Sequence, residues 1–199
     1  MTSIVNSTVS NALNRRDVVS ALLANRGDTL VVAGLGAPAW DITAAGDNPA
    51  SFPLWGAMGG AAMVALGIAI AQPTRRVLCV TGDGEMLMGL GSLATIAVER
   101  PRNLSIVVLD NEHYGETGMQ PTHTAFGVDL VAMAAAAGFA DALCVTTPAE
   151  VTTLASRIQQ GDGLLFAAVK INTEKVPLVL PPKNGELLKN RFREALLDR

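Results

Sequence analysis

The chain has 199 residues, of which 49% are apolar and 17% are charged, and its formal net charge is −3. This length suits one α/β domain with its own core and is too short for two large domains. Lysine and arginine do not cluster beyond the adjacent pairs Arg15-Arg16 and Arg75-Arg76. We therefore expect no nucleic-acid partner.

The low charge also bears on assembly, because a typical soluble domain contains roughly 25% charged residues. A chain with so little charge has more apolar surface than one small globule usually covers. We therefore expect an obligate subunit interface. A general bias of the composition toward alanine is the alternative explanation.

Cysteine content and hydropathy give expectations about location. Cys79 and Cys144 each lie in an apolar, strand-like run, so we expect two buried thiols of a cytoplasmic protein rather than a disulfide or a metal site. The first residues lack the apolar core of a secretory signal. The longest apolar run, residues 57–71, is shorter than the roughly 18 residues that a membrane span requires, so we expect no membrane segment.

The first expected elements are a helix and a strand. Leu13, Val18 and Leu22 recur at helical spacing within residues 9–26, and Gly27 suits the left-handed position after such a helix. Residues 29–33 form a continuous apolar run, which is typical of a parallel strand that is covered on both faces.

Residues 34–39, Gly-Leu-Gly-Ala-Pro-Ala, follow this strand and fit the glycine pattern of a dinucleotide site. That pattern also needs an acidic residue about 20 positions later, at the end of the next strand. The next expected strand, residues 51–54, runs instead into Trp55. A glycine turn at the sheet edge is therefore the favoured interpretation, and a dinucleotide site is the less favoured alternative.

The middle of the chain alternates between helix and strand. Residues 61–71 are expected to form a helix that lacks a polar face and is therefore buried centrally, and Pro73 ends it. A strand at 77–81, a helix at about 88–100 and a strand at 104–109 follow.

The last third continues this alternation after a loop at residues 115–127, which is rich in Gly, Thr and Pro and could cover a substrate. The alternation predicts one doubly wound parallel sheet with helices on both faces, a single domain over residues 1–175. The remaining expected elements are a helix from Asp129 to Gly138, a strand at 142–145, a helix beginning at Thr147, a strand at 164–171, and in residues 176–199 a linker and a final helix, packed on this domain or on a partner.

The chemistry is expected at the ends of two neighbouring strands. Asp83 lies between two glycines after the first of these strands, and Asn111 follows the second, 28 residues later (111 − 83 = 28). Parallel strands joined by a crossover helix end at the same edge of the sheet, so these side chains should be neighbours. A carboxylate and an amide oxygen beside a helix start can hold Mg²⁺ and a phosphate group. Asp-Gly alone is a common turn.

The combination of Gly-Asp-Gly, a helix and Asp-Asn resembles the thiamin diphosphate (ThDP) binding motif, and in particular the pyrophosphate-binding domain of the ThDP-dependent 2-oxo acid decarboxylases. The resemblance implies that Asp83 and Asn111 bind Mg²⁺ through their side chains and that His113 does so through its carbonyl oxygen. Residues 56–60 resemble the family's G-x-M-G segment. By this resemblance Met58 supports the bent cofactor from below, and Gly56 C=O and Met58 N–H contact its pyrimidine.

The resemblance extends over most of the chain, and the segments GDGEMLMGLGSLATIA, PRNL and GMQPT place it in the branch of phosphonopyruvate and sulfopyruvate decarboxylases. Glu112 and Glu116 are unexpected beside a substrate with an additional anionic group, and Tyr114 replaces an expected His. Candidate catalytic residues are His113, Tyr114 and His123. The cofactor-binding candidates are Leu35, Gly36, Gly56, Ala57, Met58, Gly82, Asp83, Gly84, Glu85, Asn111, His113, Tyr114 and Gly115.

In this family a Glu that activates the cofactor belongs to a separate pyrimidine-binding domain, for which 199 residues leave no room. The resemblance therefore implies a hetero-oligomer with an α-type chain that supplies the Glu, acting on a small 2-oxo acid to release CO₂ and an aldehyde. Alternatives are a carboligase subunit and a non-catalytic, cofactor-holding or regulatory subunit. An iron–sulfur oxidoreductase is disfavoured by the presence of only two cysteines.

Overall fold

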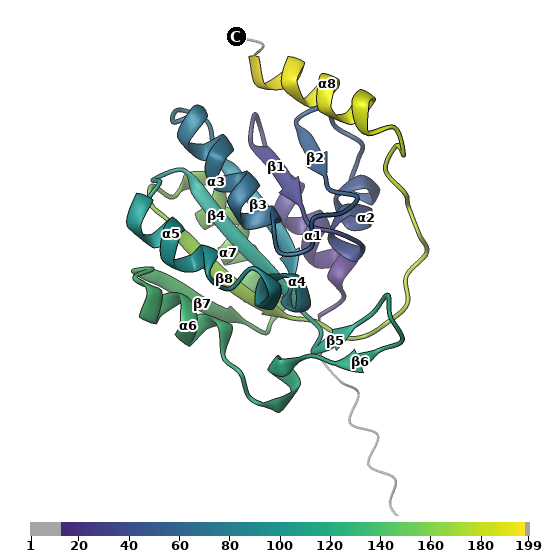
Figure 1. The fold of residues 1–199 in the computed structure, drawn as a ribbon, viewed down its shortest axis with the longest axis vertical. Coiled ribbons are helices and arrows are strands. Elements are labelled where there is room, and N and C mark those ends of the chain that lie inside the picture. Colours follow the sequence, from purple (N-terminus) through teal and green to yellow (C-terminus); the bar gives the residue numbers. More distant parts are fainter. Residues whose placement is uncertain (1–12, 198–199) are drawn as a thin grey trace, which may run out of the picture.

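The short apolar runs form a parallel sheet in the computed structural model, which describes residues 13–197 (Figure 1). Within these residues the sheet has six strands in the order β2-β1-β3-β4-β8-β7, and every neighbouring pair is parallel. The doubly wound fold expected from the sequence is confirmed. The strands are β1 (Leu30–Ala33), β2 (Ser51–Pro53), β3 (Val77–Gly82), β4 (Leu104–Asp110), β7 (Asp141–Val145) and β8 (Leu165–Lys170).

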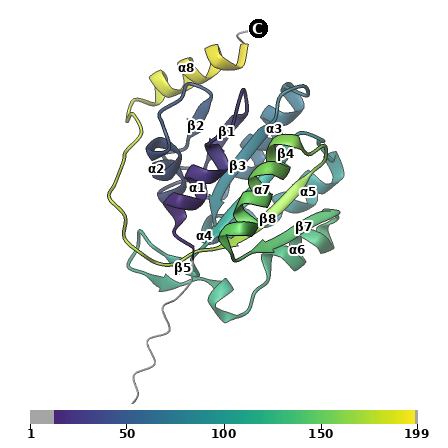
Figure 2. The same cartoon turned by 180° about the vertical axis from the view of Figure 1, so that it is seen from behind.

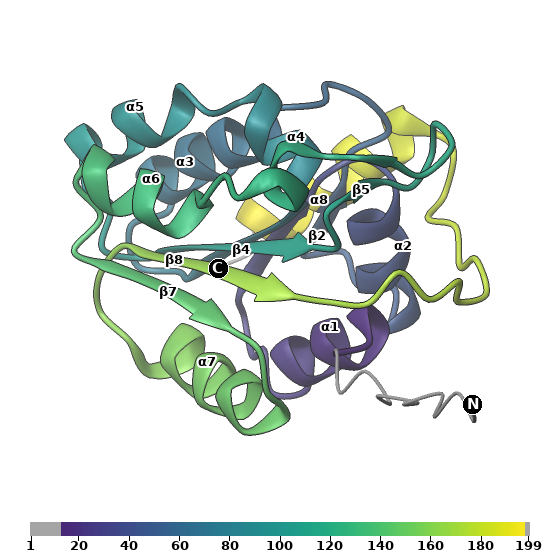
Figure 3. The same cartoon turned by 90° about the horizontal axis from the view of Figure 1, so that it is seen from below.

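Helices cover both faces of the sheet, as the view along its layers shows (Figure 3). Three helices pack on one face and are in front in Figure 2: α1 (Arg15–Leu23), α2 (Ala37–Ala44) and α7 (Pro148–Gln160). The other face is covered by α3 (Ala61–Ala71), α5 (Ser92–Glu99), α6 (Leu130–Ala137) and α8 (Gly185–Leu197). The four central strands are therefore buried on both sides, which explains their continuous apolar sequences.

Side-chain caps fix the start of several helices. Asn14 accepts hydrogen bonds from the first turn of α1, and Asp129 does the same for α6. Thr147 and Glu150 form a reciprocal capping box at α7. The expected helix at residues 9–26 is thus observed from Arg15, and residues 9–12 lie outside the described residues.

Two helical predictions were wrong in detail. The helix expected at 88–100 is observed as α5, and a further short helix, α4 (Asp83–Met88), precedes it and is separated from it by Gly89 and Gly91. The sequence analysis also missed α2, which begins with Pro38 in its first turn. The region 115–127 is more ordered than a loop, since it contains β6 (Gln120–Pro121), paired with β5 (His113–Tyr114), and the short helix η1 (His123–Phe126).

Two burial predictions are corrected by the structure. Cys79 is buried, but Cys144 is exposed because β7 is an edge strand. α3 is not buried all round: one side packs on the sheet, whereas Met63 and Ile70 on the other side are 41% and 56% exposed. Of the helices in residues 13–197, none is long and apolar enough to cross a membrane.

The last helix, α8, returns to the amino-terminal part of the sheet after an extended segment (Figure 1). The ring of Phe192 stacks on that of Phe52 in β2, with 5.1 Å between their centroids, and Leu188 is buried beside it. Arg191 forms an ion pair with Asp47. The helix therefore belongs to the same core as α3 and β3.

We predict that Phe192→Ala lowers the free energy of unfolding by about 3 kcal/mol, because it removes a buried ring and leaves a cavity against Phe52. Chemical denaturation monitored by circular dichroism measures this change. Leu187→Ala on the exposed side of α8 is the control and should cost less than about 0.5 kcal/mol. Equal effects of the two substitutions would show that α8 does not pack through Phe192.

Candidate functional site

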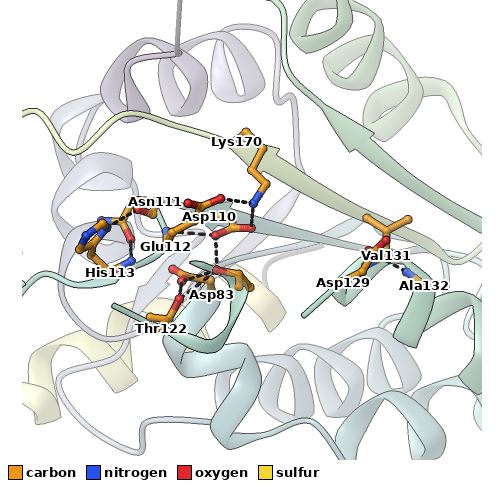
Figure 4. A network of polar contacts seen from close by, with 11 residues as sticks. Asp83, Asp110, Asn111, Glu112, His113, Thr122, Asp129, Val131, Ala132 and Lys170 are labelled. Atoms are coloured by element: carbon orange, nitrogen blue, oxygen red, sulfur yellow. Dashed lines mark hydrogen bonds and ion pairs between the residues drawn. The ribbon is translucent and has the colours of Figure 1, made fainter. Parts of the chain in front are cut away.

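The pairing of β3 with β4 creates the candidate site. Gly82 lies opposite Leu109 in the register of these strands, so the residues that follow them, Asp83 and Asp110, emerge together at the carboxyl edge of the sheet. Asn111 comes next. The two strand ends meet as expected, and Figure 4 shows the Asn111 side chain bonded to His113 and the Asp83 carboxylate linked to Asp110 through threonine hydroxyls.

Asp83 is buried, and two threonines after β6 hold its carboxylate. The hydroxyl of Thr122 donates a hydrogen bond to Asp83 Oδ2. The hydroxyl of Thr124 lies 2.8 Å from Asp110 Oδ1 and 3.3 Å from Asp83 Oδ2. Burial raises the pKa of Asp83, and the nearby Asp110 adds to this shift. A bound cation would offset the free-energy cost of burying the negatively charged form of Asp83.

Lys170 balances the acidic groups around the site. Its ammonium group lies 2.7 Å from Asp110 Oδ2 and 2.8 Å from Glu112 Oε1. Burial lowers the pKa of Lys170, but these hydrogen bonds outweigh it and raise the pKa above its usual value. Glu112, which was unexpected beside an anionic substrate, is therefore ion-paired within the chain, although it shares Lys170 with Asp110.

No site role was predicted for Asp110 or Thr122, which were noted only as parts of motifs, or for Thr124 and Lys170. Lys170 could have been found, because it ends an apolar strand in the same way as Asp110, and the two residues are paired in register between β4 and β8. The threonines could not, since their contact with Asp83 depends on the path of the β5–β6 hairpin.

The chain turns sharply after β4. The backbone N–H of His113 donates to Asn111 Oδ1 at 3.0 Å, and the N–H of Glu112 donates to Asp110 Oδ1 at 3.1 Å. Glu112 has a left-handed backbone, with φ at 63°. A non-glycine residue in this conformation is uncommon and concentrates at functional sites. The Asn111 carbonyl oxygen lies 2.8 Å from His113 Nδ1, so the turn ties Asn111 to His113 through both its side chain and its backbone.

Glu85 lies beneath the site and does not face solvent. Thr81 donates a hydrogen bond to Glu85 Oε2 at 2.9 Å, and the carboxylate lies against Gly34 in the turn after β1. Burial raises the pKa of Glu85. Among the residues that the structure describes, none provides a hydrogen-bond partner for Oε1. Glu85 thus connects the turns after β1 and β3.

The segment with Met58 packs against the end of α4. Gly59 has φ at 94°, and its carbonyl oxygen would lie 2.1 Å from a Cβ at Gly89, so both positions require glycine. Ala57 also has a left-handed backbone, with φ at 57°. Met58 is 39% exposed and is free to contact a ligand from this fixed turn.

The other candidate residues lie in the segments around Asp83. The ring of Tyr114 lies on Gly84, where a Cβ would be 2.4 Å from it, and the Glu116 carboxylate lies against the buried Gly36. Burial raises the pKa of Glu116, although Arg15 opposes this. His123 lies between Thr122 and Thr124. These two threonines are buried and point toward Asp83, whereas His123 is exposed. Leu35, Gly56 and Gly115 lie in the turns after β1, β2 and β5, and Gly82 is the last residue of β3.

The oxygen atoms at this edge suit a cation that shares its ligands with another molecule. Within residues 13–197, no group of three or more His, Cys, Asp or Glu side chains could hold a metal ion by itself. One carboxylate, one amide oxygen and a backbone carbonyl are a typical protein contribution to Mg²⁺ that is bound together with phosphate oxygens. Asp83, Asn111 and His113 can provide these three groups.

Comparison with known proteins places this site in a family. Residues 43–169 match the model of the thiamine pyrophosphate enzymes, C-terminal TPP binding domain. The fold resembles that of benzoylformate decarboxylase from Polynucleobacter necessarius with a TM-score of 0.66 and 22% identity, over 89% of this chain and 36% of that one. At this identity the likeness shows the fold alone.

Two sequence relatives bear sulfopyruvate decarboxylase names. The beta subunit from Methanothermobacter thermautotrophicus is 41% identical over 127 residues, which are 64% of this chain and 68% of the relative. Sulfopyruvate decarboxylase from Methanosarcina acetivorans is 30% identical over 98% of this chain, which spans only 50% of that longer protein. The family expected from the sequence is confirmed.

We predict that Gly89→Ala displaces the segment that carries Met58 and costs about 1–3 kcal/mol of stability, because the new methyl group would meet a backbone oxygen that cannot give way easily. Thermal unfolding measures the loss. Gly91→Ala is a matched control two residues away, where a Cβ meets nothing within 4 Å. A loss at Gly89 no larger than at Gly91 would contradict the close packing of the two turns.

Proposed function

This chain belongs to the thiamine pyrophosphate enzymes, as their C-terminal TPP-binding domain, and we propose that it is the cofactor-holding subunit of a 2-oxo acid decarboxylase. The observation that carries the proposal is the pairing of β3 with β4, which brings together the strand ends that Asp83 and Asn111 follow. The substrate class is supported by relatives that are named sulfopyruvate decarboxylases. A sulfonate- or phosphonate-bearing 2-oxo acid is the proposed substrate.

The groups of this chain fit ThDP with Mg²⁺. Asp83, Asn111 and the His113 carbonyl would hold the ion and, through it, the diphosphate. Gly56 C=O and Met58 N–H would contact the pyrimidine, and the Met58 side chain would support the bent cofactor. When bound, ThDP supplies the nucleophilic carbon and the electron sink for loss of CO₂.

The residues of the chain then have separate tasks. Thr122 and Thr124 keep the Asp83 carboxylate in one orientation. Lys170 pairs with both Asp110 and Glu112 and offsets part of their negative charge, which reduces the repulsion of an anionic substrate. His113, Tyr114 and His123 remain candidates to donate the proton that completes aldehyde release. Tyr114 is the best placed, since its ring already lies on Gly84.

A partner chain is the second part of the proposal. Apolar side chains that would be covered in an assembly are exposed on the face of α3 and α5: Met63 and Ile70 from α3, and Val98 from α5 at 79%. Such a surface is typical of a subunit interface. The relative that is named a beta subunit supports a separate α-type chain, which would supply the activating Glu. The cytoplasmic location expected from the sequence stays a prediction.

We predict that ThDP and Mg²⁺ together raise the melting temperature of this chain and that Asp83→Ala abolishes the increase. A ligand that binds only the folded state at 100 times its Kd adds about 2.7 kcal/mol of stability. Differential scanning fluorimetry with and without both ligands measures the effect. Asp28→Ala, an exposed carboxylate distant from β4, should keep the full increase. An unchanged increase in the Asp83 variant would place the cofactor elsewhere.

We also predict that turnover requires an α-type chain. This chain and a purified pyrimidine-binding chain are assayed separately and together against 2-oxo acids with sulfonate, phosphonate, carboxylate and apolar ends. The expected result is CO₂ and an aldehyde from the mixture alone, greatest for the sulfonate or phosphonate. Full turnover by this chain alone would disprove the divided site, and a 2-hydroxy ketone as the product would indicate a carboligase.

A further inference from the structure

A surface cavity lies at the opposite edge of the sheet from Asp83. It is formed by the loops that precede β3, β4, β7 and β8, and its volume is about 760 Å³. Small-molecule sites typically have volumes of roughly 300–1,000 Å³. β3 and β4 have six and seven residues, so at about 3.3 Å per residue the cavity lies about 20 Å from the carboxyl edge. The cavity is thus separate from the site of the proposed decarboxylation.

Four arginines line this cavity. Arg102 is paired with Asp162, and Arg157 with Asp141. Within residues 13–197, Arg76 and Arg100 form no ion pair; Arg100 donates only to the Ala97 carbonyl. The two aspartates also line the cavity. Four positive and two negative groups leave a local formal charge of +2 (4 − 2 = 2), in a chain whose net charge is −3.

Arg76 carries a hydrogen-bond donor that is not used within the chain. Its Nε is buried, and none of the described residues accepts a hydrogen bond from it. Its Nη2 makes only a long contact of 3.5 Å with the Gly161 carbonyl. Because Nε has almost no accessible surface, a ligand from outside the chain would meet the weakly engaged Nη end of this guanidinium group. Guanidinium groups suit the oxygens of phosphate particularly well.

The remaining lining includes the polar residues Asn103 and Ser105 and an apolar part. Ile158 from α7 and Leu165 from β8 are almost completely buried, and Leu164 is next to them. An apolar surface beside unpaired guanidinium groups would bind a molecule with both an anionic end and an organic body. We propose that this cavity is a second ligand site, for an organic phosphate with at least two negative charges.

Isothermal titration calorimetry with ADP tests the proposal on the full chain. ThDP and Mg²⁺ are present at saturation, so that ADP does not enter the cofactor site. The double variant Arg76→Gln, Arg100→Gln should bind ADP at least tenfold more weakly, because it loses two charge-assisted contacts. Lys189→Gln, Arg193→Gln on the exposed side of α8 removes the same charge elsewhere and should leave the affinity within twofold of the original.

Several results would overturn the proposal. The proposal fails if ADP does not bind at millimolar concentration. It also fails if the two double variants bind ADP equally well, or if Asp83→Ala no longer binds ADP. Inorganic phosphate that binds as tightly as ADP would disprove the organic part of the assignment. If an α-type chain abolishes ADP binding when added, the arginines bind an acidic segment of that partner instead. Arg100→Gln alone repeats the test if the double variant does not fold.

Discussion

Parallel hydrogen bonding between β3 and β4 is the constraint on which the candidate site depends. The register that sets Gly82 opposite Leu109 carries Asp83 and Asn111 to one edge, and the register between β4 and β8 sets Lys170 opposite Asp110. Successive side chains point to opposite faces of a strand. A shift of β4 by one residue would therefore turn the Asp110 side chain away from both Asp83 and Lys170. The buried apolar side chains on the two faces of the sheet are what fix these registers, so the core determines the chemistry at its edge.

Much of this arrangement could be predicted from the sequence. Continuous apolar runs marked the strands because helices cover both faces of a parallel sheet, and Asp129 and Thr147 marked helix starts because their side chains satisfy free N–H groups. The meeting of Asp83 and Asn111 followed from topology alone. The family resemblance added the roles of these two residues and of Met58, none of which the spacing of residues could supply.

The features that the sequence did not predict depend on residues that are distant in the chain but close in the folded structure. Cys144 lies in an apolar run like that of Cys79, and only the order of the strands shows that one belongs to an edge and the other to the centre. The helix α3 has no polar face, so its sequence cannot reveal which side the sheet covers. Thr122 and Thr124 reach Asp83 because the β5–β6 hairpin folds back over β3, and no local pattern encodes that return.

The exposed apolar side of α3 and α5 affects how readily the chain is degraded in a cell. A subunit that displays Met63, Ile70 and Val98 without its partner resembles the partly folded proteins that chaperones and proteases recognise. Under the proposed assembly, the partner would therefore set how much of this chain accumulates. Balanced synthesis of the two polypeptides would then limit how much active enzyme forms.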